Sequence, residues 1–215
     1  MDSTTAAYIA RKKGYGLVAL HFDYRQRTQQ RERKAFEAIC DALEIDKSAR
    51  YVIDLPFFER IGASALVDRS IDVPTGGIEE GIPVTYVPFR NGIFLSIAAA
   101  VAEKEGAEAL FIGVVEEDSS GYPDCRESFI EAMEKAINLG TKDETRITIE
   151  TPLVHLKKED IVKTAVEVGV PLELTWSCYQ NEEEACGVCD SCRLRLKGFE
   201  KAGLKDPIPY KNVDA

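Results

Sequence analysis

Short apolar runs alternate with amphipathic stretches along most of the chain. Nearly continuous apolar runs are typical of strands covered on both faces, whereas apolar residues three and four apart predict helices. The pattern predicts helices at 4–13, 29–43, 93–104, 129–137 and 160–168, and strands at 17–22, 51–55, 110–115 and 146–149. We therefore expect an α/β fold in which an open parallel sheet carries helices on both faces.

The ends of two helices carry local signals. Asp2 or Ser3 is placed to cap the first helix, Gly14 is placed to end it, and Asn91 can cap the helix that starts at residue 93. The alternation nevertheless opens with a helix that has no strand before it. We expect the first strand to be missing, with Met1 an internal methionine of a longer natural sequence or the start of a truncated one.

One long segment, 56–88, has four prolines, four glycines and no sustained period. Such segments inside a compact domain are usually functional, often as a lid or a substrate-covering loop. In open parallel sheets the site lies beyond the carboxyl ends of the strands. This rule predicts a site built from residues 23–28, the loop before Asn91, and residues 116–126.

Length and charge narrow the class of protein. The 215 residues fit one large domain, 1–172, with a small C-terminal lobe, 173–215. We expect a cytoplasmic protein without membrane association, because no stretch is apolar enough to cross a bilayer and the N-terminus lacks the apolar core of a signal peptide. A net charge of −10 argues against nucleic-acid binding and favours a small-molecule substrate.

Four of the six cysteines are closely spaced. Cys178, Cys186, Cys189 and Cys192 supply four thiolates, the full complement for one structural zinc ion per chain with no open position for chemistry. Disulfides and an iron–sulfur cluster are the alternatives. A zinc-ribbon nucleic-acid module is less favoured, because acidic residues surround the thiolates and Arg193, Arg195 and Lys197 are expected on a solvated face.

The remaining cysteines and the histidines are not predicted to react. Cys40 lies on the apolar stripe of its helix and is expected to be a buried core thiol, and Cys125 is expected to be packed. His21 and His155 are flanked by apolar residues, so we expect buried, hydrogen-bonded rings and assign no general base.

Several short motifs occur together in order. Met1-Asp2-Ser3-Thr4-Thr5 looks like the tail of a Ser-Gly-Gly-x-Asp-Ser loop, and it is followed by Val87-Pro88-Phe89-Arg90-Asn91, by Ser120 to Arg126, and by the four cysteines. With these motifs the chain resembles the 7-cyano-7-deazaguanine synthase (preQ0 synthase) family of the PP-loop ATP pyrophosphatase superfamily. The similarity runs from Asp2 to about Gly198.

The resemblance implies an ATP- and Mg²⁺-dependent enzyme of queuosine or archaeosine biosynthesis. Such an enzyme adenylates 7-carboxy-7-deazaguanine, lets ammonia displace AMP, and dehydrates the resulting amide to the nitrile after a second activation. It also implies a homodimer. A PP-loop tRNA-modifying thiolase or amidotransferase is a second possibility, although its need for basic surface conflicts with the charge of −10. A non-catalytic nucleotide-binding protein is a third, suggested by the incomplete loop.

The resemblance also assigns roles to individual residues. Its ATP-binding set is Asp2, Ser3, Thr4, Arg90 and Asn91; its substrate-binding set is Tyr24, Gln26, Arg27, Tyr122, Asp124 and Arg126; its catalytic set is Lys158 and Asp124. Without the resemblance, helix caps, a surface turn with a local ion pair, and an exposed lysine are the more common roles of such residues. Arg25 occupies a place that is often filled by a small residue in the family, which bears on the shape of the 23–28 loop.

Overall fold

Short parallel strands form the centre of the molecule as two separate pairs. The computed structural model describes residues 1–77, 81–116 and 121–211. Within these ranges β1 (Ala19–Asp23) pairs with β2 (Arg50–Asp54), and β3 (Ala109–Phe111) pairs with β4 (Thr148–Glu150), both in parallel. The predicted α/β class and parallel pairing are confirmed, with the strands in two halves instead of one continuous sheet.

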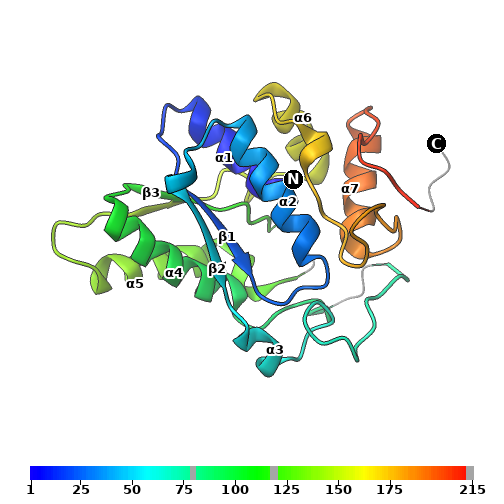
Figure 1. Cartoon of the computed structure of the whole chain (residues 1–215), viewed down its shortest axis with the longest axis horizontal. Helices are drawn as coiled ribbons and strands as arrows, with labels where there is room; N and C mark the ends of the chain where they lie inside the picture. Colours follow the sequence, from blue (N-terminus) through cyan, green and yellow to red (C-terminus); the bar gives the residue numbers. More distant parts are fainter. Residues whose placement is uncertain (78–80, 117–120, 212–215) are drawn as a thin grey trace.

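Helices cover both sides of these strands. The long helices are α1 (Asp2–Lys12), α2 (Gln29–Ala42), α4 (Arg90–Glu105), α5 (Glu127–Gly140), α6 (Lys158–Glu167) and α7 (Asp190–Lys201). Short ones are α3 (Phe57–Ile61) and the 3-10 turns η1 (Lys47–Ala49), η2 (Pro123–Cys125) and η3 (Leu172–Leu174). In Figure 1, α1 and α2 lie on one side of the strands and α4 and α5 on the other. None of the described helices is long and apolar enough to cross a bilayer.

Two predicted helix caps are wrong. Helix α1 already begins at Asp2 and has no side-chain cap, because the Asp2 carboxylate is engaged by Lys158. Asn91 lies inside the first turn of α4, and its backbone N–H donates to Asp124 Oδ2 at 2.8 Å. A carboxylate 33 residues further along the chain thus replaces the expected local cap.

A cavity of about 540 Å³ separates the two halves of the sheet. Its walls are the edge segment 15–22, which includes β1, and the edge segment 107–112, which includes β3, while apolar side chains of α1, α2 and α4 cover it above and below. Among the described residues, neither strand has a partner on the edge that faces this cavity. The slot therefore has the walls and the apolar covering of a position for a buried parallel strand.

The segment 56–88 is irregular apart from α3, as far as it is described. Arg27 organises it: its guanidinium donates to the carbonyl oxygens of Ala65 at 2.7 Å, Asp68 at 3.2 Å and Ile71 at 2.7 Å. One arginine on the β1–α2 loop thereby fixes the course of a loop some 40 residues away.

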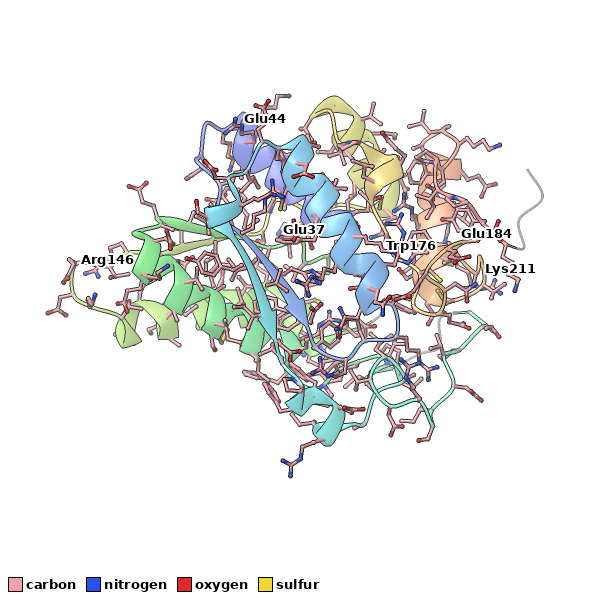
Figure 2. The ribbon with its side chains drawn as sticks, viewed as in Figure 1. Glu37, Glu44, Arg146, Trp176, Glu184 and Lys211 are labelled. Carbon is pink, nitrogen blue, oxygen red and sulfur yellow. The ribbon has the colours of Figure 1, made fainter. Side chains whose placement is uncertain are left out.

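The cysteine lobe, residues 173–211, packs against α2 and α6. Figure 2 shows Trp176 of the lobe beside α2, and the guanidinium of Arg31, in the first turn of α2, lies over its ring at 4.5 Å. Thr28 Oγ1 also donates to the Cys178 carbonyl oxygen at 3.1 Å, and α7 packs along α6. These contacts hold the lobe directly beside the carboxyl ends of the strands.

The expectation of a solvated basic face on α7 is wrong for Arg195. This side chain is 1% exposed, and it forms a two-pronged ion pair with Asp206 at 2.7 and 2.9 Å. A sequence signal was present: Cys192, Arg195 and Phe199 follow a spacing of three and four, which places Arg195 on the buried face of α7.

Candidate functional site

A pocket of about 300 Å³ lies where the first turn of α1, the start of α4 and the end of β3 meet the cysteine lobe. The α/β part contributes Met1, Asp2, Ser3, Arg90, Asn91, Phe94, residues 112–115, Tyr122, Cys125 and Lys158. The lobe contributes Ser177, Tyr179, Ser191, Leu194 and Arg195. The site is therefore built by elements from both ends of the chain, at the carboxyl edge that the sequence predicted.

Lys158 and Asp2 form an ion pair in one wall of this pocket. Lys158 Nζ donates to Asp2 Oδ2 at 2.8 Å, and the two side chains are 12% and 28% exposed. Burial would raise the pKa of the Asp2 carboxyl, but the Lys158 ammonium more than offsets that effect and the pKa lies below its usual value. The wall thus presents an ammonium group next to the amino end of α1, an arrangement that favours anions.

Two glycines allow this wall to be so compact. A side chain on Gly113 would place its Cβ 2.4 Å from the backbone nitrogen of Ser3, so the segment that follows β3 can touch the first turn of α1 here only as glycine. A Cβ on Gly198 would lie 2.5 Å from Cγ of Lys158, so the glycine lets α7 pack onto that side chain. Both glycines therefore position the Asp2–Lys158 pair.

Arg90 brings a second cation to the pocket. Its Nη1 donates to the Tyr24 hydroxyl at 3.1 Å, and its guanidinium lies 5.6 Å from the Tyr24 ring and 5.7 Å from the Phe94 ring. Burial raises the pKa of Tyr24 to about 12, so this hydroxyl stays protonated near neutral pH. The buried Nε of Arg90 has no hydrogen-bond partner in the described part of the chain, which leaves one donor for a ligand.

Asp124 and Asn91 are joined behind the pocket. Besides the capping bond, Asn91 Nδ2 donates to the Asp124 carbonyl oxygen at 3.2 Å and contacts Cys125 Sγ at 3.3 Å. Asp124 is buried and does not line the pocket. Burial raises the pKa of Cys125 to about 11, and the same cause raises that of Cys40 to about 11. Both are buried thiols, as predicted.

The residues assigned by resemblance separate into three groups. Asp2, Ser3, Arg90, Asn91, Tyr122 and Lys158 line the pocket. Thr4 and Tyr24 line the neighbouring slot between β1 and β3. Gln26, Arg27, Asp124 and Arg126 line neither; Gln26 is buried and accepts the Tyr24 N–H at 2.9 Å, and Arg126 is exposed at the start of α5. Ser120, part of one quoted motif, lies outside the described residues.

The five lobe residues that line the pocket were not predicted from the sequence. Ser177 and Tyr179 flank Cys178, and Ser191 precedes Cys192, so their closeness to metal-ligand candidates was the available signal. Nothing in that spacing indicates that the lobe faces the site. The contact depends on how α7 packs on α6.

The four lobe cysteines form one compact, buried cluster. Their sulfur atoms all lie within 4.8 Å of one another, and those of Cys186 and Cys192 are 3.9 Å apart. Four thiolates about 2.3 Å from one zinc ion would be about 3.8 Å apart, so the donor set fits a tetrahedral metal ion. Backbone N–H groups of Gln180, Asn181 and Cys186 point at Cys178 Sγ from 3.3–3.4 Å, which stabilises a thiolate there.

The two histidines behave differently from each other. His21 is largely buried and its Nε2 lies 3.1 Å from Asp23 Oδ1, as expected for a hydrogen-bonded core ring. His155 is 63% exposed and pairs with Glu127 on the surface, so the prediction of a buried ring is wrong there. Its apolar neighbours Leu153 and Val154 turn inward while His155 itself points out.

Comparison with known proteins gives consistent matches over nearly the whole chain. The family model described as "Queuosine biosynthesis protein QueC" matches residues 1–203. A 7-cyano-7-deazaguanine synthase of Nautilia profundicola is 74% identical over 211 residues, which cover 98% of this chain and 94% of that protein. A protein of the same name from Aliarcobacter butzleri is 68% identical over 98% of this chain and 92% of its own length. Another, from Campylobacter fetus, is 64% identical over 99% of this chain and 94% of its own length.

Proposed function

The chain belongs to the queuosine biosynthesis protein QueC family, and from that premise we propose that it makes 7-cyano-7-deazaguanine from 7-carboxy-7-deazaguanine, ammonia and ATP. It is a ligase that forms carbon–nitrogen bonds in queuosine biosynthesis. The observation that carries the detailed proposal is the convergence of the α1 amino end, Lys158 and Arg90 on one pocket. A homodimer and a cytoplasmic location remain expectations from the resemblance and the sequence.

The chemistry requires activation because a carboxylate is a poor electrophile. One carboxylate oxygen attacks the α-phosphorus of ATP, pyrophosphate leaves, and the acyl adenylate forms. Ammonia then attacks the acyl carbon and displaces AMP, which leaves the amide. A second adenylation, on the amide oxygen, lets AMP depart with that oxygen as the nitrogen loses two protons and becomes the nitrile.

The pocket residues serve this sequence mainly by electrostatics. The amino end of α1 and the Lys158 ammonium are placed to bind phosphate oxygens, where they would stabilise the charge that develops as pyrophosphate leaves. Mg²⁺, when bound with ATP, would neutralise further phosphate charge. Arg90 is placed to hold a carboxylate or phosphate through its unpaired Nε. Asp124 acts from behind by fixing the start of α4, and through it Arg90.

We propose that the four-cysteine cluster binds zinc and serves a structural role. Four sulfur ligands leave no coordination position for substrate. The buried cluster lies under the part of the lobe that faces the pocket, so metal binding would hold that wall in place.

We further propose that the slot between β1 and β3 takes one more parallel strand, ending in the Ser-Gly-Gly turn that the resemblance implies. Support comes from the slot itself, whose two strand edges face each other and whose upper and lower faces are apolar. Met1 and Ser3 line one end of the slot and also the catalytic pocket. A turn at that end would add backbone N–H donors to the phosphate wall.

The direct test is turnover. The purified chain is incubated with 7-carboxy-7-deazaguanine, ammonium and Mg-ATP, and nitrile and AMP are detected by mass spectrometry. We expect both products, and when ammonium is withheld we expect pyrophosphate and the acyl adenylate but no nitrile. If neither the acid nor ATP is consumed under any condition, the assignment of this activity to the chain fails.

A second version of the chain tests the slot. It carries, before Met1, an apolar strand-forming segment followed by Ser-Gly-Gly. A matched control carries an extension of the same length in which prolines replace residues of the strand. We expect the extended version, but not the control, to unfold at a higher temperature and to turn over faster. Equal behaviour of the three proteins would contradict the added strand and leave the ligase assignment intact.

A further inference from the structure

The cysteine lobe supplies one whole wall of the reaction pocket, and its aromatic residue there is Tyr179. This residue packs at once against the cysteine cluster and against the apolar cluster that contains Tyr24 and Phe58 in the α/β part. It lines the pocket together with Ser177 of the lobe. Tyr179 is thus the point at which the metal site and the reaction pocket touch.

Side-chain hydroxyl groups line the pocket beside Tyr179. Tyr122 lines the pocket as Tyr179 does, and its hydroxyl lies 2.8 Å from Thr85 Oγ1. The Arg90 guanidinium brings a positive charge to the same pocket. Each phenol can both donate and accept hydrogen bonds, whereas the guanidinium only donates them. The wall can therefore form hydrogen bonds with a planar ring that carries donors, acceptors and a negative charge.

The cysteine cluster fixes the backbone of Tyr179. The residue follows Cys178 directly in the chain. The next two N–H groups, those of Gln180 and Asn181, donate to Cys178 Sγ at 3.4 and 3.3 Å. The chain therefore wraps around Cys178 Sγ at this point, and the direction of the Tyr179 ring depends on the geometry of the cluster.

We propose that Tyr179 is a substrate-contacting residue that selects the deazapurine acid, and that the metal-bound cluster holds it in place for this task. The inference rests on the proposed function. Phosphates are expected beside Lys158 and the amino end of α1. The acid, which carries a carboxylate on a planar guanine-like ring, then fits the wall of Arg90, Tyr122 and Tyr179.

The test separates the two substrates. Tyr179→Phe removes only the hydroxyl, and we expect it to raise KM for 7-carboxy-7-deazaguanine about tenfold. KM for ATP should stay within about twofold, since the phosphates are expected beside Lys158. Equilibrium dialysis of the acid without ATP should show the same loss of affinity, which provides a readout apart from turnover.

Tyr210→Phe is the matched control. Tyr210 also lies in the lobe and its hydroxyl donates to Asp206 at 2.7 Å, but it does not line the pocket. Its loss should leave KM for the acid unchanged. Both variants should keep the metal content of the parent protein, measured by elemental analysis. Tyr122→Phe, which lies outside the lobe, should raise KM for the acid even if Tyr179→Phe lowers metal content.

The role of the cluster is tested by chelation. Metal removal should weaken acid binding in dialysis for the parent protein, and should weaken it less for Tyr179→Leu, in which the contact is already lost. An unchanged acid KM in both Tyr179→Phe and Tyr122→Phe, or an equal rise in KM for ATP, would overturn the inference. Absence of acid binding and turnover in the parent protein would instead overturn the proposed function.

Discussion

The buried Arg195–Asp206 pair permits a quantitative prediction. Both side chains are 2% exposed, and the guanidinium makes two bonds to the carboxylate, at 2.7 and 2.9 Å. It also donates to Thr175 Oγ1 at 2.7 Å. Replacing Arg195 by methionine fills much of the same volume but leaves a buried carboxylate without its cation.

The magnitude follows from the partners that remain. Breaking a buried ion pair by removing one partner costs about 3–5 kcal/mol. Asp206 would keep the Tyr210 hydroxyl at 2.7 Å and the Ile208 N–H at 3.3 Å, so we expect the low end of that range, about 3 kcal/mol. For a chain of this length that corresponds to a melting temperature lower by about 6–12 °C.

The assay is urea and thermal unfolding, with Arg193→Met as the matched control. Arg193 is exposed on the same helix and donates to two backbone carbonyls, so its loss should cost less than about 1 kcal/mol. The double variant Arg195→Met, Asp206→Leu should recover most of the lost stability, because no charge is then left buried. Equal stabilities of Arg195→Met and Arg193→Met would refute the reasoning.

Three further predictions concern the site, the metal and the loop after β1. Lys158→Gln should lower kcat/KM for ATP about a hundredfold, because it removes the ammonium beside Asp2. Lys157→Gln, at the exposed neighbouring position, is the control and should have little effect. Similar kinetics for both variants would contradict the phosphate role of Lys158. Elemental analysis should find one zinc ion per chain, and the protein should be colourless. Chelation should lower the melting temperature. A brown, iron-containing protein would contradict the assignment of zinc. Arg25 has φ = 67° and pairs with Asp54 at 2.6 Å. Arg25→Gly loses this ion pair but should relieve backbone strain, whereas Asp54→Asn loses only the ion pair, so the melting temperature of Arg25→Gly should be the higher of the two. The reverse order would show that the left-handed backbone is not strained.

Local pattern was sufficient for most secondary structure. The helix predicted at 29–43 is α2 at Gln29–Ala42, and the strand predicted at 51–55 is β2 at Arg50–Asp54. Strand β3 is shorter than its apolar run, since residues 112–115 continue as the pocket wall. Apolar periodicity reports burial, and a buried pocket wall is apolar in the same way as a strand.

The sequence by itself determined the α/β class, the parallel strands and the cysteine cluster, because each depends on spacing over a few residues. The tertiary structure alone decided the pairing of Lys158 with Asp2, 156 residues apart, the capping of α4 by Asp124, and the burial of Arg195 against Asp206. It also decided that Tyr179 faces the pocket. These contacts join elements whose relative positions follow from the packing of the whole core, and no short stretch of sequence encodes that packing.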